Sequence, residues 1–437
     1  MNAPSGSSRS DSRDGPCYAL LTALCCAVYF TSYLTRKGYD ASILAICEET
    51  GLARTAAGLA STAAVALYGS GQFVTGFLAD RFDPRRIVFL ALLVTASCNL
   101  AMPMAAGAAC VPAMAALWAV NGFSQAMFWP PLVKIIADRL SPERFKSAVF
   151  WISVASNASI VAVFLLVSGC IRFAGWRTTF DVVAVAAFAM AAIWRGAMFR
   201  SRRATPPSGD SSAESEESSK GGAARESNVQ RSKTPILPLL GASGMFFAMG
   251  AITCQGVMRD GIEVWAPSIV RDVFGLGTAD SVFSVTLLPM FGVASMAAAR
   301  ALRRALGGEI KSAAALFGIG LVCASALFVS GGWALWFGLP VLATLSACMH
   351  GANLMLIGEL PGRFSKYGCV GAVSGILNAF TYVGAAASIY GFAAIHERFS
   401  GWRPVFALWI AVLAAAMCLS LRALAKWNRF AAAADKR

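Results

Sequence analysis

Long apolar stretches recur along the whole of this 437-residue chain, and they limit what it can fold into. Hydrophobic residues make up 57% of the sequence and charged residues only 14%, whereas soluble domains carry about 25% charged residues. A helix needs roughly 17 to 25 apolar residues to cross a bilayer. We therefore predict an all-α membrane protein with twelve transmembrane helices, at residues 18–47, 55–79, 87–107, 111–137, 147–171, 178–198, 236–270, 281–299, 312–330, 333–358, 368–394 and 403–424.

Lysines and arginines gather in alternate loops between these spans. The loops after the second and fourth spans carry Arg81, Arg85, Arg86, Arg139, Arg144 and Lys146. Because basic loops stay in the cytoplasm, we predict a multi-pass protein of the inner (plasma) membrane, surrounded by lipid, with both termini cytoplasmic. The net charge of +14 is then mostly a consequence of topology. No basic patch with interleaved aromatics is visible, so we expect no nucleic-acid partner.

A polar segment divides the chain. Residues 201–234 are rich in Ser, Glu, Gly and Arg and have few apolar side chains, so this segment has too little apolar surface to fold alone. We predict a cytoplasmic tail at 1–16, a six-helix half at 17–199, a disordered cytoplasmic linker at 200–235, a second six-helix half at 236–425 and a tail at 426–437.

The two predicted halves echo each other. Gly175-Trp-Arg-Thr-Thr-Phe180 recurs as Gly401-Trp-Arg-Pro-Val-Phe406, 226 residues later (401 − 175). Two arginines inside apolar spans, Arg36 and Arg259, are 223 residues apart (259 − 36). Similar offsets in unrelated segments predict two pseudo-symmetric halves, with a binding site between them near the membrane midplane.

Arg36 and Arg259 are the most informative of the charged residues. A charge at membrane depth costs about 2.5 to 3.5 kcal/mol even on the lenient scale, and it normally faces a cavity or a partner. At helical spacing, Tyr29, Tyr33 and Asp40 share a face with Arg36, and Gln255 and Glu263 share a face with Arg259. The helical period turns Lys37 about 100° away from the Arg36 face. Structural ion pairs with Asp40, Asp260 or Glu263 are the alternative to a binding role.

The loop Gly76-Phe-Leu-Ala-Asp-Arg-Phe-Asp-Pro-Arg-Arg86 resembles the signature loop of the major facilitator superfamily. It lies between the second and third predicted spans, where that superfamily carries it. The resemblance implies the major facilitator fold. It also implies a gating role for Gly76, Asp80, Arg81 and Arg85 rather than a contact with substrate.

Four further segments resemble the organophosphate:phosphate antiporter family. They are Tyr33-Leu-Thr-Arg-Lys37, Asn121-Gly-Phe-Ser-Gln-Ala-Met-Phe-Trp-Pro-Pro131 with Lys134, Arg259 to Pro267, and Glu359-Leu-Pro361. The resemblance implies exchange of an organic phosphate, of the glycerol-3-phosphate or sugar-phosphate class, for inorganic phosphate. It places the two phosphate-binding arginines on Arg36 and Arg259 and the following lysine on Lys37. Candidate contacts around them are Tyr29, Tyr33, Gln125, Asn157, Gln255 and Tyr382.

Two positions depart from that family. Ser156-Asn157 replaces a His-Asn pair in the fifth span, which removes an imidazole, and Val264 stands where a carboxylate commonly precedes Trp265. The substrate's carbon skeleton therefore stays open. Proton-coupled uptake of another anion or a sugar is one alternative, and a transporter-like sensor of sugar phosphates is another.

Little in the sequence favours an enzyme. The chain has no Walker-type phosphate loop, and its 12 cysteines show no CxxC or Cys/His zinc spacing. Its two histidines, His350 and His396, are interpreted as structural residues at helix ends. We expect no cofactor, no metal site and a monomer.

Overall fold

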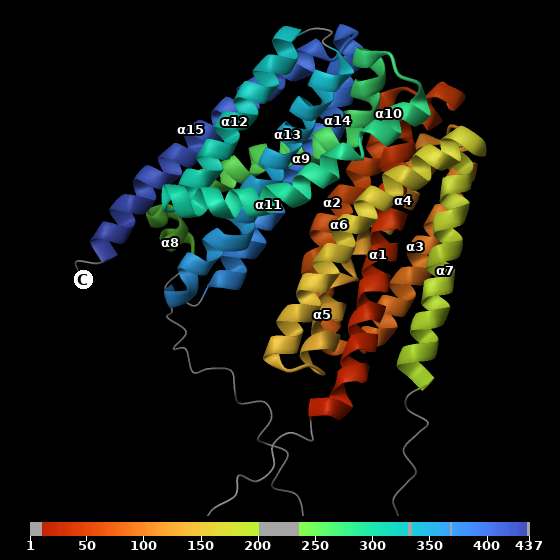
Figure 1. Ribbon diagram of the computed structural model, residues 1–437, viewed down its shortest axis with the longest axis horizontal. Coiled ribbons are helices and arrows are strands. Elements are labelled where there is room, and N and C mark those ends of the chain that lie inside the picture. The colour runs from red at the N-terminus through yellow and green to blue at the C-terminus, as the bar shows by residue number, and fades with distance from the viewer. Residues whose placement is uncertain (1–10, 201–235, 331–333, 368, 435–437) are drawn as a thin grey trace, which may run out of the picture.

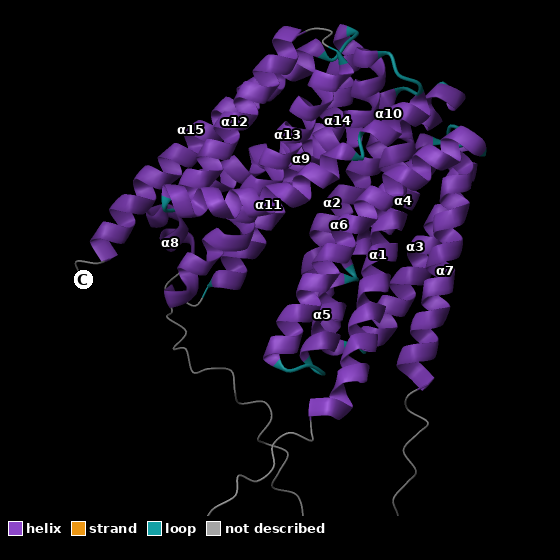
Figure 2. Ribbon diagram, in the orientation of Figure 1, coloured by secondary structure: helices purple, strands orange, loops and turns teal. Residues whose placement is uncertain are grey.

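The computed structural model describes residues 11–200, 236–330, 334–367 and 369–434, and within these ranges the chain forms helices and loops without any strand (Figures 1 and 2). Residues 1–10 of the predicted N-terminal tail, nearly all of the predicted linker and the last three residues lie outside this part. The first helix already begins at Asp11, and the last continues to Ala434, past the predicted boundary at 425.

The first half contains seven helical pieces that form six membrane-length segments. They are α1 (Asp11–Thr50), α2 (Arg54–Arg81), α3 (Pro84–Gly107), α4 (Val111–Ala126), α5 (Trp129–Ala137), α6 (Pro142–Phe173) and α7 (Trp176–Arg200). The predicted span 111–137 is interrupted between α4 and α5. Pro130 and Pro131 follow the break, and because a proline lacks the N–H that an inner turn needs, they sit in the first turn of α5.

The second half has the same organisation with more interruptions. It consists of α8 (Ile236–Ser243), α9 (Met245–Phe274), α10 (Thr278–Ser284), α11 (Leu287–Leu306), α12 (Glu309–Ser330), α13 (Leu335–Asn353), the π-helix η2 (Leu354–Glu359), the 3₁₀ helix η3 (Leu360–Tyr367), α14 (Val370–Phe399) and α15 (Arg403–Ala434). Gly244 separates α8 from α9 with φ = 79°, a conformation that glycine adopts without strain. Joining adjacent pieces gives six segments here too, so the described residues form twelve segments, which is consistent with the prediction.

Nine stretches of the described chain are long and apolar enough to cross a membrane by themselves. The second, fourth and seventh segments fall short. The second, α2, is rich in glycine, serine and threonine, and the fourth is broken between α4 and α5. The seventh carries Arg259, Asp260 and Glu263 within a few turns of α9. The charges that make α9 informative therefore also lower its hydropathy.

The packing of helices repeats between the halves. In the first half α2 packs on α4, α1 packs on α6 and α7, and α3 packs on α7 and α4. In the second half the corresponding pairs are α11 with α13, α9 with α14 and α15, and α12 with α15 and α13. Between the halves, α2 contacts α14, and α6 contacts α10 and α11. When each segment is replaced by its counterpart in the other half, the contact of α2 with α14 becomes the contact of α11 with α6. The two halves are therefore pseudo-symmetric.

The repeated Gly-Trp-Arg motif performs the same structural task twice. Trp176 Nε1 donates to Glu49 Oε2 at 2.8 Å, and Trp402 Nε1 donates to Asp272 Oδ2 at 2.9 Å. Both carboxylates lie near the end of the first long helix of their half, 223 residues apart (272 − 49). In each half, the indole therefore anchors the start of the sixth segment to the end of the first.

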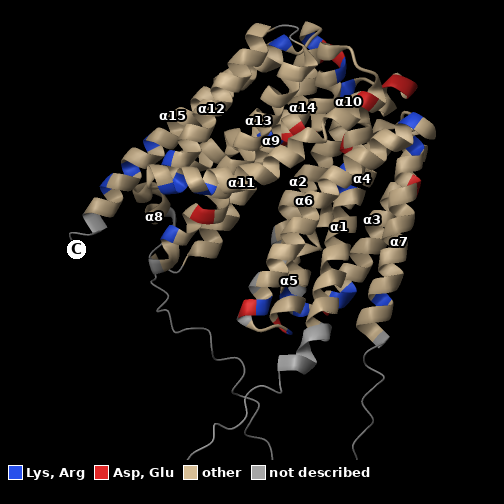
Figure 3. Ribbon diagram, in the orientation of Figure 1, with Lys and Arg blue, Asp and Glu red and all other residues tan. Residues whose placement is uncertain are grey.

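The two halves meet near one end of the bundle and diverge toward the other (Figure 1). The meeting end includes α10 and the C-terminal part of α6, whereas the start of α1 and the end of α15 lie toward the diverging end. Charged residues concentrate near these ends and are sparse between them (Figure 3). The few charges at mid-depth therefore stand out as candidates for function.

Candidate substrate site

A cavity of about 430 Å³ lies between the two halves. Its walls come from both halves, mainly from α1, α2, α6, α9 and α14. The residues that line it are Tyr29, Tyr33, Arg36, Lys37, Tyr68, Gln72, Trp129, Ser153, Ser156, Asn157, Ile160, Arg259, Asp260, Glu263, Met296, His350, Asn378 and Tyr382. Of the nine predicted binding residues, seven are in this set, and Gln125 and Gln255 are not.

The two arginines have different neighbours. The Arg36 guanidinium lies 4.0 Å from the centre of the Tyr68 ring, in a cation–π arrangement. Arg259 instead makes an ion pair with the adjacent residue, with Nη2 2.6 Å and Nε 3.0 Å from Asp260 Oδ2. The alternative pairing of Arg36 with Asp40 is not present among the described contacts. Arg36 therefore keeps N–H groups available for an anion, and Arg259 shares its own with a carboxylate.

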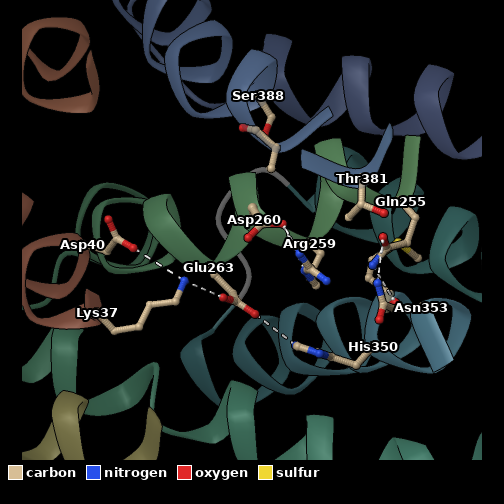
Figure 4. A network of polar contacts seen from close by, with 12 residues as sticks. Lys37, Asp40, Gln255, Arg259, Asp260, Glu263, His350, Asn353, Thr381 and Ser388 are labelled. Carbon is tan, nitrogen blue, oxygen red and sulfur yellow. Dashed lines mark hydrogen bonds and ion pairs between the residues drawn. The ribbon is translucent and has the colours of Figure 1, made fainter. Parts of the chain in front are cut away.

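A chain of charged contacts crosses the site (Figure 4). Lys37 Nζ lies 3.5 Å from Asp40 Oδ2 and 3.0 Å from Glu263 Oε2. Glu263 Oε1 lies 3.1 Å from His350 Nε2, and Asp40 accepts a hydrogen bond from Ser61 Oγ at 2.5 Å. Lys37 therefore reaches the cavity although the helical period turns it from the Arg36 face, and it neutralises carboxylates from both halves.

Gln125 and Gln255 lie behind the cavity wall. Gln125 Nε2 donates to Thr35 Oγ1 at 3.0 Å and to Thr95 Oγ1 at 2.9 Å, in a buried network. Gln255 Nε2 donates to the Met349 carbonyl at 3.0 Å, and its Oε1 accepts a longer bond from Asn353. Each amide joins helices of its own half. In this structure they position the walls of the site rather than contact its interior.

None of the described side chains of the predicted gating loop lines the cavity. Gly76 and Asp80 belong to α2, but the surroundings of both lie outside the described part of the structure. Arg81 is exposed, and Arg85 Nη1 donates to the Met198 carbonyl at 3.5 Å. Arg85 thus joins the start of α3 to the end of α7, which fits a role in holding helices rather than in binding substrate.

Sequence reasoning missed Tyr68, Trp129 and His350 as cavity residues. Tyr68 and Gln72 are one helical turn apart on α2, a spacing that places both on one face. The polar pair on one face of an apolar helix could have indicated that Tyr68 faces the cavity. His350 was interpreted as structural, yet its ring lies in the cavity wall against Glu263. Within the described residues, no group of three or more His, Cys, Asp or Glu side chains is arranged to hold a metal ion.

The sequence profile of the Major Facilitator Superfamily matches residues 25–389, most of the chain. The chain belongs to the Major Facilitator Superfamily. This superfamily membership agrees with the twelve segments and the signature loop. It makes the protein a multi-span membrane transporter in type and not an enzyme.

Curated proteins that are similar to this chain at low identity have names connected with phosphate esters. A "Probable hexose phosphate transport protein" of Chlamydia pneumoniae is 22% identical over 92% of this chain and 89% of its own length. The "Membrane sensor protein UhpC" of Salmonella typhimurium is 23% identical over 90% and 88%. A glycerol-3-phosphate transporter of Bacillus subtilis is 31% identical, but over only 36% of each chain. These names agree with the organophosphate:phosphate antiporter family predicted from the motifs.

Solved structures of the superfamily match the fold. A bacterial homologue of the human lysosomal transporter Spinster, in an inward-facing and occupied conformation, aligns with a TM-score of 0.66. The alignment covers 95% of this chain and 97% of the homologue at 14% identity. At that identity the match supports the major facilitator fold alone.

Proposed function

We propose that this protein exchanges an organic phosphate, of the glycerol-3-phosphate or sugar-phosphate class, for inorganic phosphate. The observation that carries the proposal is that Arg36 and Arg259, at equivalent positions of the two halves, line one cavity. A guanidinium offers a planar pair of donors that matches two phosphate oxygens, and it stays charged at any physiological pH. An anion between them would contact both halves at once.

The charge of the cavity wall supports an anionic ligand. Arg36, Lys37 and Arg259 carry three positive charges, and Asp260 and Glu263 carry two negative ones. Asp40 does not line the cavity but lies 3.5 Å from Lys37 Nζ, so the support for an anionic ligand comes from Arg36, whose guanidinium has no carboxylate partner among the described contacts. Lys37 holds Glu263 at 3.0 Å, so the carboxylate that would repel phosphate is already paired. Asp260 is the group that phosphate would displace from Arg259.

The connection between the halves supports alternating access. At the meeting end Arg54 Nη1 lies 2.7 Å from Asp272 Oδ2, and Glu48 pairs with Arg271. A bound phosphate that bridges Arg36 and Arg259 would stabilise the form in which the halves close around it. A ligand shifts a conformational equilibrium only by its differential affinity for the two states. The carrier with phosphate bound would therefore change readily between its inward-open and outward-open forms, and the empty carrier would not. Exchange would then be obligatory.

We place the diverging end, with both termini, in the cytoplasm, and the protein in the inner (plasma) membrane as a monomer. The alternating distribution of basic residues supports this orientation. In this orientation the cavity is reached from the cytoplasm, and the ion pairs at Arg54 and Glu48 form on the outer side.

The test is exchange in proteoliposomes loaded with phosphate. We expect labelled phosphate to enter, and labelled glycerol 3-phosphate or glucose 6-phosphate to compete with it and to enter in turn. Arg36→Lys and Arg259→Lys each keep the positive charge but lose the planar pair of donors of the guanidinium. A charge-assisted hydrogen bond contributes about 1.5 to 3 kcal/mol, so phosphate exchange should fall at least about tenfold. Arg398→Lys, on the exposed end of α14, is the matched control. Unchanged flux in both cavity variants would refute the proposal.

A sensor is the second candidate, because a relative named as a membrane sensor matches nearly as much of the chain (90%) as the named hexose phosphate transport protein does (92%). Rapid counterflow of a phosphate ester would exclude a purely sensing role. Saturable binding of the ester without flux would support one. A flux that follows the pH gradient and ignores phosphate on the opposite side would instead indicate proton coupling.

A further inference from the structure

A small chamber adjoins the substrate cavity between the two halves. It shares Asn157, Ile160, Glu263 and His350 with the cavity, so these four side chains form the boundary between them. Its volume is about 20 Å³, enough for roughly one water-sized group. The rest of its wall is mostly apolar and comprises Phe164, Val285, Leu288, Pro289, Gly292 and Ser346.

Ser346 supplies an unused polar group to this chamber. Its side chain on α13 is 0% exposed, and within the described residues its Oγ has no hydrogen-bond partner. A buried hydroxyl without a partner costs about 1 to 3 kcal/mol. The wall of the chamber therefore offers a donor and acceptor for a group that is not part of the chain.

His350 lies one turn along α13 from Ser346 and is held in place. Its Nε2 is 3.1 Å from Glu263 Oε1, and a β-carbon at Gly292 would lie 3.2 Å from its Cδ2, so the ring packs closely over α11. A neutral imidazole that directs Nε2–H at a carboxylate carries its acceptor lone pair on Nδ1. Figure 4 shows Glu263 directed at His350, so a neutral His350 ring would carry its proton on Nε2 and offer Nδ1 as the acceptor.

Gln255 strengthens this arrangement from behind. It donates to the Met349 carbonyl, next to His350, at 3.0 Å. Immediately after this point, α13 gives way to the π-helix that begins at Leu354, and π-helices are frequent at functional sites. The backbone that carries His350 is thus tied to α9, the helix that carries Arg259 and Glu263.

We propose that this chamber is a hydroxyl-binding subsite that determines specificity for the organic part of the substrate. Ser346, His350 and Asn157 would bind one hydroxyl group of a polyol or sugar, while Arg36 and Arg259 hold the phosphate. A hydroxyl both donates and accepts, which matches the serine, the imidazole and the amide, and the apolar wall suits the carbon that bears it. The Glu263 carboxylate at the boundary disfavours a second anion there. The inference rests on the proposed function.

The first experiment measures inhibition of phosphate exchange by the reconstituted full-length protein. Glycerol 3-phosphate, glucose 6-phosphate and propyl phosphate, which lacks hydroxyls on its carbon chain, are the competing esters. In the wild type we expect a hydroxylated ester to inhibit at least about tenfold better than propyl phosphate. In Ser346→Val, whose added carbon occupies the chamber, this preference should fall to within about twofold. Ser420→Val is the matched control, because Ser420 is also buried with an unpartnered Oγ but lies on α15 outside both linings.

Two substitutions of His350 separate a loss of hydroxyl recognition from a loss of folding. His350→Leu should lose the preference, and His350→Gln, whose amide supplies a donor and an acceptor in place of those of the ring, should recover part of it. Equal inhibition by all three esters in the wild type, or an undiminished preference in both Ser346→Val and His350→Leu, would overturn the subsite. Absence of any phosphate exchange in the wild type would overturn the proposed function itself and the subsite with it, so the two failures are distinguishable.

Discussion

Lys37 of the first half and Glu263 of the second are joined by a 3.0 Å contact between Nζ and Oε2. With the 223-residue offset, position 37 corresponds to Asp260 and position 40 to Glu263. The repeat therefore reads Arg36-Lys37 with Asp40 in one half and Arg259-Asp260 with Glu263 in the other. The one reversal of charge, at 37 and 260, gives a lysine that pairs with carboxylates of both halves and an arginine that carries its own counterion.

Removal of Lys37 should leave carboxylates facing the bound anion. We expect Lys37→Met to lower the melting temperature and to raise the KM for phosphate by about tenfold or more, because breaking one side of a buried pair costs about 3 to 5 kcal/mol. Adding Glu263→Gln should recover part of both losses. The measurement is a double-mutant cycle on melting temperature and on phosphate exchange. Strictly additive effects would contradict the pairing.

The fold could be predicted well from the sequence because length and hydropathy decide it. Apolar windows indicated the twelve segments, although the second, fourth and seventh are not among the nine stretches that could cross a membrane by themselves, and the Gly-Trp-Arg repeat indicated the two halves. The ends were harder to place. α15 continues nine residues past the predicted boundary at 425, since charged residues such as Lys426 and Arg429 ended the apolar pattern without ending the helix.

The site could be predicted only in part, because helical spacing gives the face of a helix but not its neighbour. Arg36 and Arg259 stand out by their cost in the membrane. Gln125 and Gln255 lie on plausible faces, yet they hydrogen-bond within their own halves. His350 reaches the cavity through the packing of α13 on α9 and α11, which no local pattern encodes.

Tyr68 should contribute to the affinity for phosphate through Arg36. Its ring lies 4.0 Å from the guanidinium and 5.1 Å from the Tyr382 ring of the other half. A cation–π contact contributes about 0.5 to 2 kcal/mol, so Tyr68→Leu should raise the KM for phosphate about two- to thirtyfold. Tyr68→Phe keeps the ring and should stay near the wild-type value. If the two variants behave alike in proteoliposome exchange, the ring face is not what orients Arg36.

We expect transport to require that the two halves separate at their meeting end. Ser168 Oγ on α6 donates to the Ala279 carbonyl on α10 at 2.8 Å, across the boundary, and the nearby Arg172 and Asp280 also form a pair. Oxidation of a Ser168→Cys/Ala279→Cys double variant should cross-link α6 to α10 and stop phosphate exchange, and a reductant should restore it. The single variants control for the native cysteines. Full exchange by the cross-linked protein would contradict alternating access at this end.

The packing of α9 on α14 sets how firmly Arg259 is held, and glycines make that packing close. A β-carbon at Gly256 would collide with the Thr381 carbonyl oxygen, whereas one at Gly391 would meet nothing within 4 Å. Overpacking costs about 1 to 3 kcal/mol, so Gly256→Ala should lower the melting temperature in detergent. Gly391→Ala on α14 should leave it unchanged or raise it slightly, because alanine favours a helix over glycine by about 1 kcal/mol. Equal melting temperatures for the two variants would show that the helices can separate without loss, and the close contact would then have no part in positioning Arg259.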